Sequence, residues 1–168
     1  MGMSAALLPE FDQEMAHTRT SLSRVPDAQF EYRPHAKSMT LGSLANHLMN
    51  LPYWGIRTLE NPELDIMPGG VPLPSRAKPN VAEMVAQFDE NTAKFRALIS
   101  AATDESLNAP WRLLGNGQVF FTLPRIVVLR STVMNHMIHH RAQLGVYLRM
   151  LDVPLPAIYG PSADERNM

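Results

Sequence analysis

The positions of the prolines constrain the fold of this 168-residue chain more than any other feature. The chain has fourteen prolines, and they divide it into four segments in which apolar residues recur every three or four positions. This spacing is typical of amphipathic helices, and proline is disfavoured in a helix interior. The sequence therefore predicts an all-α fold, a four-helix bundle, with residues 1–168 forming a single domain.

The predicted helices begin near Leu7, Thr40, Asn80 and Thr122. Thr40 is a suitable N-cap, and the spacing of Asn80 and Glu83 matches a capping box. Between the second and third helices, residues 61–80 carry five prolines and two glycines, which predicts a long ordered surface crossover.

Before the fourth helix, Asn116-Gly117 lies between apolar residues. This dipeptide is typical of the turn in a short hairpin. We therefore expect a short hairpin or loop between the third and fourth helices.

The fourth predicted helix contains His136, His139 and His140, half of the six histidines of the chain. At about 100° per residue, His136 and His140 fall on the same side as Leu129 and Leu144, whereas His139 faces sideways. Two buried imidazoles need partners, because each unpaired polar group costs about 1–3 kcal/mol. A shared divalent cation would satisfy both rings, and so would hydrogen bonds to polar neighbours or water.

A third histidine would favour the metal interpretation. His47 lies about 80° to one side of the inward direction of the second helix, facing a neighbouring helix. His17 and His35 are poorer candidates, because the first lies on a polar helix face and the second in a loop. The chain has no cysteine, so any metal would depend on imidazole and oxygen ligands.

Two segments of the sequence resemble the DinB/YfiT-like family of small four-helix metal-binding proteins. They are YRPHAKSMTLGSLANHL (residues 32–48) and HMIHHRAQLGVYLRMLDVP (residues 136–154), and the ending PAIYGPSADE (residues 156–165) is also similar. The resemblance implies one divalent ion, usually zinc or nickel, with iron or manganese as alternatives. Its ligands would be His47, His136 and His140, and the resemblance also implies a homodimer.

An open site of three neutral imidazoles suits catalysis better than a structural role. The resemblance implies a metal-dependent hydrolase or a thiol-dependent transferase or isomerase, with a small-molecule substrate and a low-molecular-weight thiol as a possible partner. Met137 replaces the general-base glutamate of an H-E-x-x-H protease, which argues against that chemistry. His139 and Tyr147 are candidate proton carriers, and Gln143 is expected to orient a ligand ring.

The net charge, the lengths of the apolar runs and the positions of the glutamates argue against several other functions. The net charge of −1 gives no support for binding nucleic acid or an anionic membrane. The N-terminal residues lack the pattern of a signal peptide, and no apolar run approaches membrane-spanning length, so we expect a cytoplasmic protein. A di-iron centre is disfavoured, because the fourth helix offers no glutamate and Glu14 lies off the apolar stripe of the first. A non-catalytic metal-binding stress protein or dimeric interaction protein stays an alternative.

Overall fold

The computed structural model describes residues 2–166. Its long helices are α1 (Met3–Leu22), α2 (Leu41–Glu60), α3 (Val81–Ala101) and α6 (His136–Met150). Both predicted caps are confirmed: the Thr40 hydroxyl accepts from Ser43 N, and the Asn80 side chain accepts from Glu83 N. Two prolines, Pro9 and Pro52, lie inside α1 and α2 rather than between helices.

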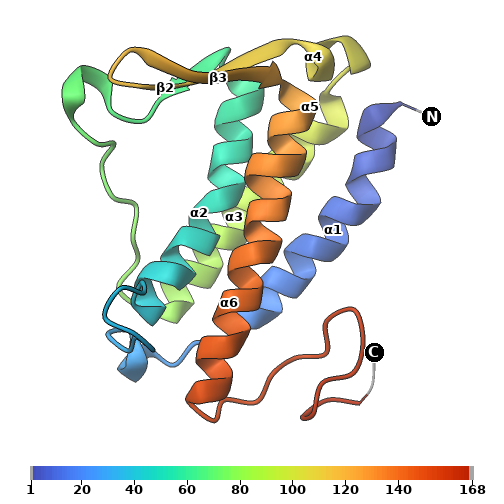
Figure 1. The fold of residues 1–168 in the computed structure, drawn as a ribbon. Helices are drawn as coiled ribbons and strands as arrows, with labels where there is room; N and C mark the ends of the chain where they lie inside the picture. Colours follow the sequence, from blue (N-terminus) through green and yellow to red (C-terminus); the bar gives the residue numbers. More distant parts are fainter. Residues whose placement is uncertain (1, 167–168) are drawn as a thin grey trace.

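The four long helices lie side by side (Figure 1). Helix α1 contacts α3 and α6, and α2 contacts the same two helices. Helices α2 and α3 run in the same direction, because the crossover returns the chain to the end where α2 began (Figure 1). It runs through the 3-10 turn η2 (Pro68–Gly70). The crossover therefore makes α2 and α3 parallel neighbours in the bundle.

A small sheet covers one end of the helices, so the prediction of an all-α fold is wrong in this respect. Strand β1 (Glu63–Asp65) pairs parallel with β2 (Pro110–Gly115), which pairs antiparallel with β3 (Gln118–Pro124). The predicted hairpin is confirmed, with Asn116 and Gly117 at φ 51° and 75° in its turn. The crossover contributes only the edge strand β1, which explains how so proline-rich a segment joins a sheet.

The fourth helical segment differs from the prediction in its start and its geometry. Residues 122–124 belong to β3, and the helix begins only with α5 (Arg125–Val128), which follows the short helix α4 (Asp104–Asn108) and the hairpin. A π-helical stretch, η3 (Leu129–Asn135), then leads into α6. A π-helix has a different pitch from an α-helix, so a uniform rotation of 100° per residue does not hold through this segment.

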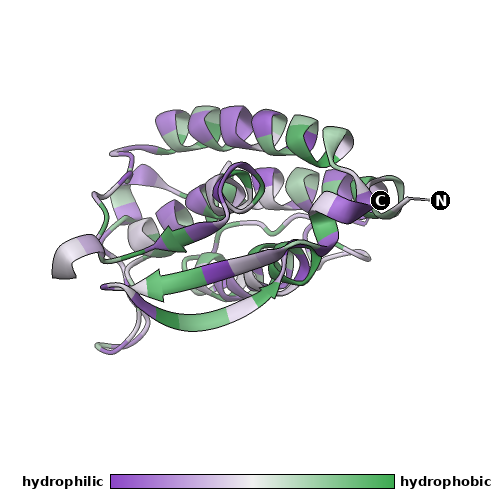
Figure 2. Cartoon of the chain, turned by 90° about the horizontal axis from the view of Figure 1, so that it is seen from above, coloured by the Kyte–Doolittle hydropathy of each residue, from purple (hydrophilic) through white to green (hydrophobic). Residues whose placement is uncertain are grey.

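The buried apolar residues form a main core between the long helices and a smaller one under the sheet. Phe11, Leu48 and Phe95, from α1, α2 and α3, are each fully buried in the main core. The smaller core consists of Leu64, Trp111, Leu113 and Val128. Each long helix carries both hydrophobic and hydrophilic residues, as expected for amphipathic helices (Figure 2). Within residues 2–166, no helix combines the length and apolar character needed to cross a bilayer.

The segment after α6 runs back beside α1 and α6 (Figure 1). The Tyr159 hydroxyl lies 2.7 Å from both carboxylate oxygens of Glu14 on α1 and 2.6 Å from Nη2 of Arg141 on α6. Glu14 is buried, although the helical pattern placed it off the apolar stripe. Its burial is explained by the salt bridge to Arg141, at 2.7 Å.

Candidate metal centre

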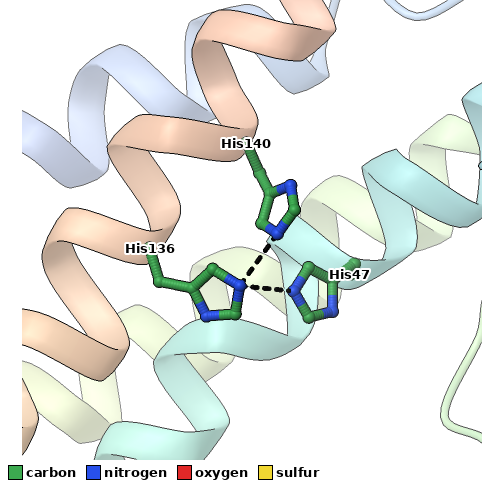
Figure 3. Close-up of side chains that lie close together, drawn as sticks. All are labelled: His47, His136 and His140. Atoms are coloured by element: carbon green, nitrogen blue, oxygen red, sulfur yellow. Dashed lines mark hydrogen bonds between the residues drawn. The ribbon is translucent and has the colours of Figure 1, made fainter.

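Three histidines from two helices meet at one point (Figure 3). His47 projects from α2, and His136 and His140 project from successive turns of α6. His136 Nε2 lies 3.3 Å from His47 Nε2 and 2.8 Å from His140 Nε2. One nitrogen from each ring can be chosen so that all three lie within 4.8 Å of one another. This cluster could hold a metal ion.

The cluster lies at the edge of the buried helix faces rather than in their centre. All three histidines are half-buried, whereas Met137, Leu144 and Leu148 on α6 are fully buried. The sequence pattern placed His136 and His140 on the buried face itself, and the structure corrects this to the boundary between α2 and α6. His35 is exposed in the loop before α2, and His17 packs against Tyr159. Neither of these two histidines belongs to the cluster.

The outer nitrogens of two of the rings have hydrogen-bond partners. His136 Nδ1 donates to the backbone carbonyl of Thr132 at 3.2 Å, since a carbonyl can only accept. His140 Nδ1 donates to Gln143 Oε1 at 2.7 Å. In these tautomers both Nε2 atoms carry a lone pair and no hydrogen. Two lone pairs that face each other across 2.8 Å repel, and a shared cation would remove the repulsion.

The environment of two of the histidines favours their neutral form. Burial lowers the pKa of His47, and the neighbouring His140 and His136 act in the same direction, so that its pKa is about 4. Burial, with His140, also lowers the pKa of His136. Because metal ligation requires the unprotonated ring, these shifts favour ligand-competent imidazoles at neutral pH.

The donor set fits a divalent cation of the first transition series. Zn–N bonds of about 2.0–2.1 Å in a tetrahedral arrangement separate two ligand nitrogens by about 3.3 Å. The observed separations of 3.3 and 2.8 Å are close to this value. Within residues 2–166, no carboxylate joins the three histidines. Three neutral ligands would thus leave the full charge of the cation available to a further ligand.

The candidate residues around the cluster have different environments. His139 is exposed, with its ring centre 4.9 Å from that of His140. Tyr147 is buried, and its hydroxyl donates to the backbone carbonyl of Met39 at 3.3 Å, so it packs in the core. Met137 points into the core, so the position of a protease glutamate does not face the cluster. Of these candidates, Gln143 alone contacts a histidine of the cluster by a hydrogen bond.

A cavity of about 460 Å³ adjoins the cluster. His47 forms part of its wall, together with Tyr53 and Trp54 of α2. The opposite wall consists of crossover residues, among them Leu73 and Arg76. A small molecule in this cavity would therefore lie beside one of the three imidazoles.

The residue that holds the crossover at this cavity was not among the predicted site residues. Asn46, next to His47, is buried, and its side chain accepts from Lys78 N at 2.7 Å and donates to Lys78 O at 3.2 Å. A buried amide on an apolar helix is a signal of such pairing. The partner could not be identified, because the crossover has no periodicity that places Lys78 beside α2.

The chain is similar to one protein family and to solved structures over nearly its whole length. The family model described as "DinB family" matches residues 1–167. A DinB-like protein from Bacillus subtilis, YjoA, is 17% identical, with a TM-score of 0.69 over 97% of this chain and 99% of that one. A DinB-like protein from Bacillus cereus ATCC 10987 is 22% identical, with a TM-score of 0.68 over 90% and 95% of the two chains. No curated protein is significantly similar in sequence.

At these identities the two solved structures establish that the fold is shared. The family match is independent of them and extends over nearly the entire sequence, including both histidine-bearing helices. The resemblance seen in the two histidine segments is therefore confirmed, and the chain belongs to the DinB family.

Proposed function

We propose that the protein binds one divalent cation through His47, His136 and His140 and uses it to transform a small molecule. The observation that carries the proposal is the convergence of three Nε2 atoms beside a cavity large enough for a substrate. Four protein ligands normally close a structural metal site, whereas three leave room for a reacting group.

The protein side chains would present the ligand atoms in a fixed orientation. Thr132 O and Gln143 Oε1 hold the Nδ1 hydrogens of His136 and His140, so each Nε2 lone pair points to the common centre. A bound divalent cation would supply Lewis acidity, which polarises a carbonyl group and acidifies water or a thiol. His139 is exposed and lies beside the cluster, so it would carry protons between the cluster and solvent.

Two reaction classes agree with this arrangement. A neutral ligand set favours anionic nucleophiles. The site therefore suits hydrolysis by hydroxide and equally suits a thiol-dependent transfer, in which a low-molecular-weight thiolate is the nucleophile. Zinc and nickel are the first candidates for the ion, since imidazole ligands suit both.

Metal analysis tests the ligand set. We expect about one zinc or nickel ion per chain in the wild-type protein and a large loss in each of the variants His47→Ala, His136→Ala and His140→Ala. His139→Ala is the matched control, because it removes an adjacent exposed imidazole outside the cluster. Stoichiometric metal in His136→Ala or His140→Ala would contradict the proposal.

Activity assays test the catalytic role. Metal-loaded and metal-stripped protein would be compared on ester, amide and electrophile panels, the last with and without an added thiol. Turnover that requires the metal and is lost in His140→Ala would support catalysis. A fully loaded protein that turns over none of these compounds would favour the non-catalytic alternative, a metal-binding stress or interaction protein.

A further inference from the structure

The cavity beside His47 contains one cationic side chain, Arg76 of the crossover. Its guanidinium carbon lies 4.0 Å from the centre of the Tyr53 ring, in a cation–π contact. Tyr53 is on α2, less than two turns after His47. Arg76 therefore lies on the crossover side of the cavity, against a residue of the helix that carries His47.

Arg76 differs from most arginines of the chain in having no anionic partner. Arg19, Arg96 and Arg141, for example, each form a salt bridge with a carboxylate of a neighbouring helix. Among residues 2–166, neither a carboxylate nor a hydrogen-bond acceptor pairs with Arg76. Its charge is thus available to a ligand in the cavity.

Two contacts hold this arginine in place. The paired hydrogen bonds between Asn46 and the backbone of Lys78 fix the crossover two residues beyond Arg76. The cation–π contact holds the guanidinium over the face of the Tyr53 ring. A guanidinium in such a contact keeps its N–H donors at the edge of its plane, where they match the two oxygens of a carboxylate. The arrangement is therefore prepared to bind an anion without further ordering of the chain.

We propose that Arg76 binds the carboxylate of the substrate, so that the protein acts on small organic carboxylates. This inference rests on the proposed function, since it assigns the reacting end of the substrate to the three-histidine site. His47 and Tyr53 are six residues apart, which is roughly 9 Å along a helix axis. The substrate would span about this distance, with its carboxylate at Arg76.

The other side chains that line the cavity limit the polarity of the middle of the substrate, between its carboxylate and its reacting group. Trp54, Ile66 and Leu73 form an apolar part of the cavity wall. Asn50, between His47 and Tyr53 in the sequence of α2, adds a polar group. An aliphatic or aromatic body would bury this surface, whereas a polar one would lose hydration. The substrate class is therefore an amphiphilic carboxylate, with a reactive group at the end remote from the carboxylate.

Binding of two matched probes tests the inference. Octanedioic acid monohydroxamate has a metal-binding hydroxamate at one end and a carboxylate at the other, and its methyl ester lacks only the negative charge. Dissociation constants would be measured calorimetrically on protein loaded with one zinc ion per chain. Arg76→Gln is the test variant. Arg33→Gln is the control, because Arg33 is also exposed, has no carboxylate partner within residues 2–166 and lies outside the cavity.

We expect the wild-type protein to bind the acid about tenfold more tightly than the ester, as for a charge-assisted hydrogen bond. Arg76→Gln should remove this preference without weakening ester binding, and Arg33→Gln should keep it. An equal affinity of the wild type for both probes, or a preference that persists in Arg76→Gln, would overturn the carboxylate site.

Binding of the ester distinguishes a failure of this inference from a failure of the proposed function. Ester binding that requires zinc would keep the open metal site even if Arg76 proves irrelevant. Conversely, ester binding that is indifferent to zinc would contradict the metal site, while loss of the acid preference in Arg76→Gln would still support anion recognition by Arg76.

Discussion

Single imidazole nitrogens decide what the histidine cluster can do. His136 and His140 have their Nδ1 hydrogens committed to Thr132 O and Gln143 Oε1. Each ring therefore presents a bare Nε2 to its neighbours, in a geometry that suits a cation and disfavours an empty cluster. The hydrogen-bond partners of the rings matter as much as the rings themselves.

The contact between Gln143 and His140 leads to a prediction about metal affinity. Gln143→Leu removes the acceptor that fixes the His140 ring, so the affinity for zinc should fall by about 10–100-fold. Competition with a chromophoric chelator measures the change. His139→Gln, which alters an exposed neighbour without touching the ring contact, should leave the affinity nearly unchanged. An unaltered affinity in Gln143→Leu would show that Gln143 has no orienting role.

The lowered pKa of His47 predicts how the metal-free protein responds to acid. An unfolded histidine titrates near 6.5, whereas folded His47 has a pKa of about 4. Between these values the unfolded state binds more protons, so the free energy of unfolding should decrease as the pH falls. The contribution is fully present above about 6.5 and is lost toward about 4.

Urea denaturation of the metal-free protein at several pH values measures this dependence. His47→Gln keeps a polar side chain that does not titrate, so its unfolding free energy should vary less with pH over the same interval. Identical pH profiles for the two proteins would show that His47 is not the source of the pH dependence.

At the scale of elements, close packing of α2 on α3 depends on one glycine. A Cβ atom on Gly55 would lie 2.2 Å from the end of the Phe95 ring, which is itself fully buried and packs edge-on against Phe11. Position 55 thus lets the two parallel helices approach each other. The ring that occupies the space beside Gly55 belongs to α3, so the need for glycine at this position depends on a contact between helices.

Substitution of this glycine should destabilise the protein. We expect Gly55→Ala to lower the free energy of unfolding by about 1–3 kcal/mol, because the methyl group overpacks the contact. Gly145→Ala is the control: no atom lies within 4 Å of its added Cβ, so it should stabilise α6 by about 0.5–1 kcal/mol. Urea denaturation measures both variants. A stable Gly55→Ala protein would show that Phe95 can move aside at little cost.

The elements also show where the helical pattern was reliable and where it failed. Apolar spacing correctly predicted α1, α2 and α3, and capping residues gave the starts of α2 and α3 to within a residue. Pro9 and Pro52 lie inside α1 and α2, within the helical segments that the apolar spacing predicted, so not every proline marks a boundary. The π-helix η3 could not be predicted, because its pitch arises from the fit of this segment against its neighbours.

At the scale of the whole molecule, a buried ion pair joins the C-terminal segment to two helices. Arg141 on α6 is 4% exposed and bonds to Glu14 and Tyr159, and its other nitrogen donates to Thr18 of α1 at 3.2 Å. Burial raises the pKa of Tyr159, and its hydrogen bond to Glu14 has the same effect. The network connects residues that are far apart in sequence and orders the segment after α6.

A double-mutant cycle tests this network. Arg141→Met leaves Glu14 buried without a cation and should cost about 3–5 kcal/mol of stability. Adding Glu14→Leu removes the unpaired charge, so the double variant should be more stable than Arg141→Met alone. Thermal and urea unfolding measure the coupling. Simple additivity of the two single changes would show that the pair does not act as a unit.

The sequence alone determined the helical character, the caps and the hairpin turn, because these depend on short-range periodicity and on residue chemistry. The three clustered histidines were implied by the resemblance of two segments to the DinB/YfiT-like family. The sequence could also nominate Gln143, one turn from His140 on the same helix. Tertiary structure decided the small sheet, the boundary position of the cluster, and the roles of Asn46, Arg76 and Glu14. Each of these depends on contacts between residues distant in the chain, and no local pattern specifies which segments will meet.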